Sequence, residues 1–490
     1  MKLFTKKPIE ALLAQAAEDG THTLKRGLGW PSLTLLGIGG VIGGGIFVLT
    51  GQQAALNAGP AIFLSFVLAG VVCVFAAMCY AELAAMIPVS GSAYTYTYAT
   101  LGEFIAWLIA WDLILEYGLA AATVSAGWAG HFNDMLQGFG MGLPEQWSKA
   151  PYDFVGNHLV ATGSTLNIPA MGIVTLMGAV LISGVTKSAL VNNLIVSFKV
   201  MIVIAVIVIG LGHVHPEYWS PLIPERVPAV GDEPGHFGYG GILTAAGVIF
   251  FAYIGFEAVS TGAQEAKDPG KTMPIAILLS LGICTILYLL MALVITGLQP
   301  YTTLNNDHPV ATAMGMIPGM EWLRQAVNMA VAIGLASTIL SLLYGQSRIF
   351  FAMSRDGLLP PLFGTVHPGT RTPIWGTVIV TAFAAIVGGL FPIGILGELV
   401  SMGTLLAFAL ICGGVMYLRI SQPNLPRAFK VPFVWISAPL GVAGCIFLIS
   451  GLPVPTWLRL VIWMGIGLVV YFGYAHWHSR YHEKKLAGEA

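Results

Sequence analysis

Ionisable side chains stand inside several of the most apolar runs of this 490-residue sequence. The acids are Asp112 and Glu116 in "WLIAWDLILEYG" and Glu257 in "FFAYIGFEAVS", and the base is Lys199 in "NNLIVSFKVMIV". A charged side chain at the centre of a bilayer costs about 2.5–3.5 kcal/mol. These four residues are therefore candidates for holding a proton or a charged solute.

Glycine is concentrated in one of these runs, "LGIGGVIGGGIF" at 36–47, with six glycines in twelve positions. One interpretation is close packing, because small residues let membrane helices approach each other. The other is a span of two half-helices joined by an unwound stretch, whose free amides and carbonyls need a cavity or a ligand. Gly255, in the middle of another apolar run, predicts a second interrupted helix and favours the half-helix interpretation.

The composition indicates the environment in which these residues must be positioned. Of the residues, 56% are hydrophobic and 9% are charged, whereas a soluble domain carries about 25% charged residues. The mean hydropathy is +0.80, and the formal net charge of −1 gives no reason to expect a nucleic-acid partner. The sequence therefore predicts an all-α integral membrane protein surrounded by the lipid bilayer.

Twelve apolar runs have about the 20 residues needed to cross a bilayer. Their approximate limits are 31–56, 61–88, 101–131, 168–185, 190–213, 240–264, 274–297, 325–353, 373–391, 394–418, 431–451 and 457–476. The first and the sixth are the interrupted ones, which predicts two repeats of five helices at 30–213 and 239–418, followed by two additional helices at 431–476. Because five is odd, the second repeat is inverted relative to the first.

The basic residues predict the orientation, since they collect on the cytoplasmic side of membrane proteins. With the N-terminus inside, the segments 1–29 and 477–490 are cytoplasmic, and that side receives 17 of the 22 basic residues. They are Lys2, Lys6, Lys7, Lys25, Arg26, Lys187, Lys267, Lys271, Arg348, Arg355, Arg371, Arg419, Arg427, Lys430, Arg480, Lys484 and Lys485. The stretch "PIEALLAQAAEDG" is expected either as an amphipathic helix on the inner membrane surface or as a loosely ordered tail.

The stretches "GIGGVIGGGIF", "FFAYIGFEAVSTGAQEAKDPGKTMP", "VNNLIVSFKV" and "GQSRIFFAMSRDGLLP" resemble the amino acid/polyamine/organocation (APC) superfamily, and within it the bacterial cationic amino acid transporter group. The resemblance covers about residues 25–475. It implies the five-plus-five inverted-repeat (LeuT-like) fold and secondary active transport of L-amino acids by alternating access. The substrates would be cationic or small neutral amino acids, moved into the cell by proton symport or exchanged.

The resemblance also implies a substrate site between the two interrupted helices. The substrate carboxylate would meet amides of the first helix, its amine would meet carbonyls of the sixth, and Phe251 would cover it as a gate. The residues carried over are Val41, Gly43, Gly44, Gly45, Phe250, Phe251 and Ile254. Relatives often have threonine or another small residue in place of Gly44, so we expect a slightly larger pocket here.

The charged residues would extend this site. By resemblance Glu116 and Glu257 point towards the substrate side chain, which suits arginine, lysine or ornithine, unless one of them is protonated or bonded to the scaffold. Asp112 shares a helix face with Glu116, and one of these two is expected to bond a backbone or aromatic donor. Ser341 is a weaker pocket candidate, because a membrane serine commonly bonds a neighbouring helix.

Lys199 has two interpretations. Its side chain snorkels to the interface, since only about nine residues precede it in its run, or it gains and loses the coupling proton, since burial disfavours the charged form. The resemblance places it against the backbone of the first span's inner half, where other members of the fold bind sodium. We expect proton coupling through Lys199.

No motif for catalysis or for a cofactor accompanies the spans, and the five cysteines form no C-x-x-C pair. We therefore expect no enzyme, no metal and no cofactor, with the proton as coupling ion. An amino acid exchanger, or a non-transporting amino acid sensor on the same fold, is the alternative. Compact loops suggest a bacterial inner membrane, and the sequence leaves open whether a small membrane subunit accompanies the chain.

Overall fold

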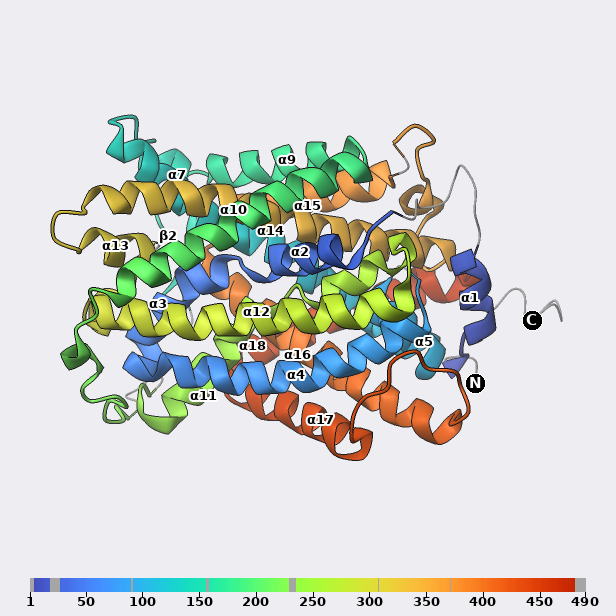
Figure 1. Ribbon diagram of the computed structural model, residues 1–490. Helices are drawn as coiled ribbons and strands as arrows, with labels where there is room; N and C mark the ends of the chain where they lie inside the picture. The colour runs from blue at the N-terminus through green and yellow to red at the C-terminus, as the bar shows by residue number, and fades with distance from the viewer. Residues whose placement is uncertain are drawn as a thin grey trace.

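The chain forms a bundle of long helices that run in both directions along one axis (Figure 1). The computed structural model describes residues 4–17, 27–89, 91–155, 158–228, 235–306, 308–370 and 372–480. Six of the basic residues used to predict the orientation lie outside the described residues: Lys2, Lys25, Arg26, Arg371, Lys484 and Lys485. Most of the C-terminal segment 477–490 lies outside them as well.

The α-helices account for most of the described chain. Their bounds are α1 Ile9–Ala17, α2 Trp30–Val41, α3 Thr50–Gln53, α4 Ile62–Met86, α5 Ser92–Thr100, α6 Glu103–Leu113, α7 Ala120–Gly138, α8 Glu145–Ser148, α9 Ile168–Ile182, α10 Val185–Leu211, α11 Gly238–Ile249, α12 Pro269–Leu298, α13 Pro309–Gly315, α14 Trp322–Arg355, α15 Ile374–Leu390, α16 Ile393–Ser421, α17 Val434–Ser450, α18 Val454–Val470 and α19 His476–His478.

Shorter segments of 3₁₀ or π helix continue or interrupt them. These are η2 Gly45–Leu49, η3 Ala54–Ala58, η4 Gly59–Ala61, η5 Ile114–Leu119, η6 Pro216–Trp219, η7 Phe250–Tyr253, η8 Glu257–Glu265, η9 Tyr301–Thr303, η10 Pro361–Gly364 and η11 Tyr471–Ala475. One antiparallel hairpin, β1 Tyr152–Val155 and β2 His158–Ala161, pairs Tyr152 with Ala161.

Length and apolarity make this an all-helical, multi-pass membrane protein apart from the hairpin. Among the described residues, eight helical stretches are long and apolar enough to cross a membrane, and four more apolar helices are shorter. The shorter ones are α2, α9, α15 and α17. The short length of α2 has a local cause, because its run ends at the predicted glycine-rich interruption.

Two helices are interrupted near their middles. The α2 helix ends at Val41, Ile42 takes an extended conformation, and helical structure resumes with η2 at Gly45. The α11 helix ends at Ile249 and continues as η7, and a turn at Gly255, with φ +125°, separates η7 from η8. Both interruptions fall where the glycine pattern predicts them.

The two ends of the bundle differ. The α1 helix lies across one end, and the hairpin and α13 lie at the other (Figure 1). Ile9 and Leu12 of α1 are buried, and the Lys7 amide donates to the Tyr98 carbonyl at 3.2 Å. The N-terminal segment thus packs on the protein itself, and the described part is neither a loose tail nor a helix whose apolar face is left for lipid.

Candidate functional site

The two interruptions lie against each other. A Cβ atom on Gly255 would stand 2.4 Å from the Gly40 carbonyl carbon, and one on Gly45 would stand 2.4 Å from Cα of Ala252. Real Cβ atoms do not approach other atoms this closely, and Gly255 also has a positive φ that favours glycine. Glycine at these positions therefore allows backbone-to-backbone contact between the two interrupted spans. The first span consists of α2 and η2, and the sixth consists of α11, η7 and η8.

The side chain of Tyr288, in the neighbouring helix α12, contacts the backbone of both interruptions. Its hydroxyl lies 2.6 Å from the carbonyl oxygens of both Val41 and Ala252, and its single proton is shared between these two acceptors. Both carbonyls lie beside a helix break, where the regular i to i+4 bond is lost. The phenol of Tyr288 thus satisfies backbone groups that the membrane would otherwise leave unpaired.

A cavity of about 10 Å³ lies between the interruptions, enough for about one water molecule. Its lining residues come from the first helix, η7 and its turn, α7 and α14, and they are Gly40, Val41, Gly43, Gly45, Ala120, Val124, Phe251, Ile254, Thr338 and Leu342. Apart from the Thr338 hydroxyl and the backbone, this lining is apolar. A solute larger than water enters only if the walls move.

The Lys199 ammonium contacts the backbone of the first interruption. Four oxygen acceptors lie within hydrogen-bond distance of its three N–H donors: the carbonyl oxygens of Gly39 at 2.9 Å and Ile42 at 2.6 Å, and the hydroxyls of Ser337 at 2.9 Å and Thr338 at 3.2 Å. Its side chain is 1% exposed, so it does not snorkel to the interface. The Thr338 hydroxyl lies 2.8 Å from both of the same carbonyl oxygens, which makes a cation site built almost entirely of neutral oxygen atoms.

Glu257 stabilises the turn at Gly255 in the second interruption. Both of its carboxyl oxygens accept the Gly255 amide at 2.9 Å, and the Tyr117 hydroxyl donates to one of them at 3.4 Å. The carboxyl group of Glu116, in the π helix η5, interacts with that of Glu257. Among the described residues, neither Glu116 nor Asp112 has a side-chain hydrogen-bond partner that meets normal geometry. Glu257 therefore makes the scaffold bond that was the alternative role for Glu116 or Glu257, and the bond expected on Asp112 or Glu116 is on neither of them.

Buried ion pairs close the end of the bundle near α1. Glu265 at the end of η8 accepts from Arg348 at 3.2 Å and from the Tyr344 hydroxyl at 2.6 Å, and neither charged side chain is exposed. The Glu265 carbonyl also accepts the Gly27 and Leu28 amides, at 2.9 Å each. These bonds tie the chain entering α2 to the sixth helix and to α14.

A second buried pair seals the same end. The Lys7 ammonium lies 2.5 Å from Asp356 Oδ1, and the Tyr94 hydroxyl donates to Asp356 Oδ2 at 2.7 Å. Nearby, Glu82 pairs with Arg419 at 2.6 Å and with Arg427 at 3.0 Å. The segment before α1 therefore helps to hold this end closed.

Comparison with known proteins identifies the family of this chain. The sequence pattern of the amino acid permease family matches residues 28–472, which include both interruptions and Lys199. The chain belongs to the amino acid permease family. As a member of the APC superfamily this permease is a transporter and not an enzyme.

Three relatives illustrate the range of names in the family. The methylthioribose transporter of Bacillus subtilis (strain 168) is 43% identical over 97% of this chain and 98% of its own length. The branched-chain amino acid permease BcaP of the same organism is 44% identical over 98% of both chains. The vacuolar cationic amino acid transporter 4 of Arabidopsis thaliana is 34% identical over 83% of this permease and 65% of its own length. The names of the second and third relatives refer to amino acid transport, and the name of the first does not.

Within the permease, the structure brings part of the predicted substrate site together. Val41, Gly43, Gly45, Phe251 and Ile254 line the small cavity. Gly44 precedes η2, and Phe250 begins η7, but neither is among the residues that line it. Nor are the predicted side-chain readers, which are Glu116 in η5 and Glu257 at the start of η8.

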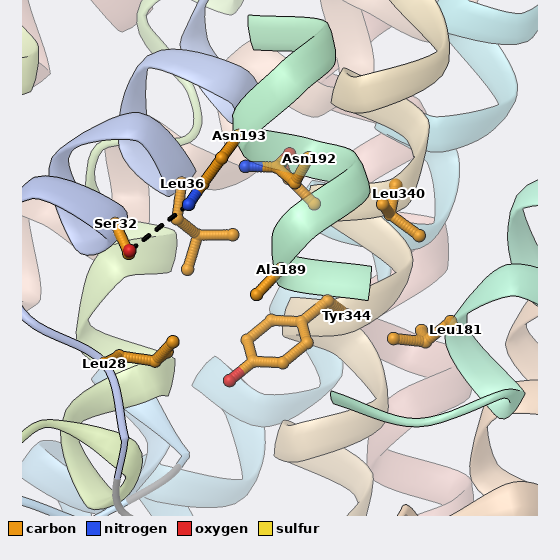
Figure 2. A pocket seen from close by; sticks show the side chains of 10 residues that line it. Leu28, Ser32, Leu36, Leu181, Ala189, Asn192, Asn193, Leu340 and Tyr344 are labelled. Carbon is orange, nitrogen blue, oxygen red and sulfur yellow. Dashed lines mark hydrogen bonds between the residues drawn. The ribbon is translucent and has the colours of Figure 1, made fainter. Parts of the chain in front are cut away.

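Ser341 lies elsewhere. Its hydroxyl donates to the Asn192 side chain at 3.3 Å, which is the helix-to-helix bond that was its alternative role. It lines a separate cavity of about 30 Å³ between α2, α9, α10 and α14. Figure 2 shows this cavity, in which Leu36, Leu340 and Tyr344 surround a space next to the bond between Asn193 and Ser32, 3.2 Å long.

Sequence reasoning missed Thr338, Tyr288, Tyr117 and Ser337. Thr338 and Ser337 are adjacent on α14, three and four residues before Ser341, so a scan of the whole helix turn would have found them. Tyr288 has no local signal beyond a phenol inside an apolar run. Among the described residues there is also no group of three or more His, Cys, Asp or Glu side chains that could hold a metal ion.

Proposed function

We propose that this permease is a secondary active transporter for α-amino acids with apolar side chains. The observation that carries the proposal is the cavity between the two interruptions, which combines exposed backbone with an apolar lining. Amides of the first helix suit a carboxylate and carbonyls of the sixth suit an ammonium group. The residues proposed to contact the substrate are Val41, Gly43, Gly44, Gly45, Phe250, Phe251 and Ile254.

The substrate class follows from where the acids lie. Glu257 already accepts the Gly255 amide with both oxygens, so a cationic side chain would have to compete with a backbone bond. The name of the branched-chain relative supports an aliphatic substrate, whereas the names of the cationic relatives support arginine or lysine with Glu116 as the reader. Methylthioribose is a second candidate, because the relative with that name aligns with 97% of this chain.

Proton symport into the cell through Lys199 is the proposed coupling, without a metal or other cofactor. Its support is the set of four oxygen atoms around the ammonium group, two of which belong to the first helix. Loss of the proton would weaken these bonds and free the carbonyls of Gly39 and Ile42. An exchanger and a sensor are the alternatives, and both predict no accumulation driven by a proton gradient.

The proposed architecture has twelve spans. Two inverted five-helix repeats, 30–213 and 239–418, are followed by two additional helices at 431–476, with both termini in the cytoplasm. The positions of the basic residues and the Bacillus relatives support a bacterial inner membrane. A small membrane subunit is a candidate partner.

Alternating access would require the two ends to open in turn. The end near α1 is closed by buried pairs such as Arg348 with Glu265, and the space between the interruptions holds about one water molecule. The opposite end has a cavity of about 250 Å³. These observations support a state that is closed towards the proposed cytoplasmic side.

A ligand panel tests the proposal. Purified protein in detergent is heated with each L-amino acid, with methylthioribose and with buffer, and a ligand at 100 times its dissociation constant stabilises by about 2.7 kcal/mol. We expect leucine, isoleucine or valine to raise the melting temperature most. A shift with arginine or lysine alone would assign Glu116 and Glu257 as side-chain readers, and a shift with methylthioribose alone would overturn amino acid transport.

A further inference from the structure

The cavity of about 250 Å³ approaches the size of small-molecule sites, which begin at about 300 Å³. It lies at the end of the molecule where the hairpin and α13 are found, away from α1 (Figure 1). Its lining comes from η2, α7, the segment 148–167 and the turn between α15 and α16. The lining residues are Val48, Ala126, Gly127, Gly130, Ser148, Lys149, Ala150, Tyr152, Thr162, Asn167, Phe391 and Pro392.

This outer cavity continues the walls of the inner one. Ala120 and Val124 line the inner cavity and Gly127 lines the outer one, and this i, i+4, i+7 spacing places all three on one face of α7. On η2, Gly45 lines the inner cavity and Val48 the outer one. A solute that leaves the outer cavity along α7 therefore arrives at the two interruptions.

Two groups in the outer cavity suit an anionic oxygen. The Ser148 hydroxyl is buried and has no hydrogen-bond partner among the described residues. The adjacent Lys149 ammonium pairs with Glu145 at 3.0 Å, with exposed fractions of 56% and 79%. An exposed pair of this kind contributes little, so the ammonium can turn to a bound carboxylate at small cost.

Two other side chains of this cavity already make a hydrogen bond. The Asn167 side chain accepts the Ala170 amide at 3.2 Å, and the Thr162 hydroxyl donates to the Ala150 carbonyl at 2.6 Å. The rings of Tyr152 and Phe391 stack with centroids 6.3 Å apart and give an apolar wall. The cavity therefore offers a place for one carboxylate beside a surface for an apolar side chain.

We propose that the outer cavity is a second amino acid site, in which Lys149 and Ser148 hold the substrate carboxylate before the substrate moves to the inner cavity. This inference rests on the proposed function. The outer site captures the amino acid from outside the cell, and it raises the concentration of substrate at the interruptions. It lies away from Lys199, so it does not take part in proton coupling.

The test compares binding and uptake of L-[³H]leucine. The double variant Ser148→Ala, Lys149→Gln should bind one leucine per chain where the unsubstituted protein binds two, and its KM for uptake into proteoliposomes should rise about tenfold at unchanged kcat. Gly45→Ala, which fills the inner contact, should bind one leucine and transport none. Glu145→Gln is the matched control, because it removes the partner of Lys149 and should keep both sites.

The outcomes separate this inference from the proposed function. A KM of the double variant within twofold of the unsubstituted value, with one leucine bound by both, overturns the outer site and leaves amino acid transport standing. Failure of the unsubstituted protein to bind or move leucine overturns both. The melting temperature of each variant is measured without ligand, and equal values show that the comparison is between folded proteins.

Discussion

Lys199 is the residue on which the coupling proposal depends. Its ammonium group bonds two carbonyls of the first helix and two hydroxyls of α14, although 160 residues separate it from Gly39. A buried ammonium with no carboxylate partner among these contacts is costly to keep charged. A proton that is bound in one state and released in another therefore fits this site better than a permanent charge.

Substitution of Lys199 should uncouple transport from the proton gradient. Lys199→Met keeps the bulk of the side chain but leaves the Gly39 and Ile42 carbonyls with only the Thr338 hydroxyl as a donor. We expect loss of leucine accumulation under an inward proton gradient, measured in proteoliposomes, with counterflow retained. Gly282→Ala, at an open position of α12, is the control and should still accumulate substrate. Accumulation by Lys199→Met at the unsubstituted level would rule out Lys199 as the coupling site.

The Glu265–Arg348 pair predicts a large effect on stability. Removal of one partner of a buried pair costs about 3–5 kcal/mol, because the other charge stays buried. Glu265→Gln should therefore lower the melting temperature strongly, whereas Glu145→Gln removes an exposed pair and should change the free energy of unfolding by less than about 1 kcal/mol. Equal melting temperatures for the two variants would show that the Arg348 charge is compensated in another way.

At the scale of elements, the interruptions are the feature that distinguishes this bundle from continuous helices. Each leaves backbone groups without helical partners, and the neighbours that satisfy them are Tyr288, Thr338, Lys199 and Glu257. The π helix η5 in the third span carries Glu116 next to this region. Such irregular turns often mark functional positions.

The contact between the interruptions should not tolerate a methyl group. Gly255→Ala would put a Cβ 2.4 Å from the Gly40 carbonyl carbon at a φ of +125°, a conformation that costs a non-glycine residue about 1–3 kcal/mol before the clash is counted. We expect loss of the leucine bound between the interruptions, with one leucine per chain left at the outer cavity, and a lower melting temperature in a thermal-shift assay.

Gly282→Ala is the matched control for Gly255→Ala. It lies in the middle of α12, nothing stands within 4 Å of its added Cβ, and alanine favours the helix by up to about 1 kcal/mol. This variant should bind and transport normally. Normal transport by Gly255→Ala as well would mean that the sixth helix is not held against the first during the cycle.

At the scale of the whole molecule, the two ends have different chemistry. The end near α1 is closed by Lys7 with Asp356 and by Arg348 with Glu265, and the end near the hairpin is hollowed. The α17 and α18 helices present large apolar side chains to the surroundings, such as Val454 and Val461. Such a surface is suited to contact with lipid.

The proposed orientation is tested by labelling introduced cysteines. The five native cysteines are buried and should not react, so Thr165→Cys and Gln422→Cys, at exposed positions near opposite ends, can be compared directly. In intact cells a membrane-impermeant maleimide should label Thr165→Cys, and it should label Gln422→Cys only after permeabilisation. The reverse pattern would invert the topology and move the outer cavity to the cytoplasmic side.

By itself, the sequence determined the environment of this protein, the approximate limits of its apolar helices and the interruptions in two of them. These properties depend on composition and on residues a few positions apart, such as the glycines of 36–47. The apolar run around Lys199 allowed both burial and snorkelling, and the structure decided for burial.

Only the tertiary structure decided which residues meet at the interruptions. Tyr288 bonds Val41 across 247 residues, Thr338 bonds Gly39 across 299, and Ser341 faces a different cavity from its neighbour Thr338. Glu257 accepts the Gly255 amide of its own helix and does not line the cavity between the interruptions. Partners of this kind depend on how helices pack and rotate against each other, and no local pattern encodes the rotation of one helix relative to another.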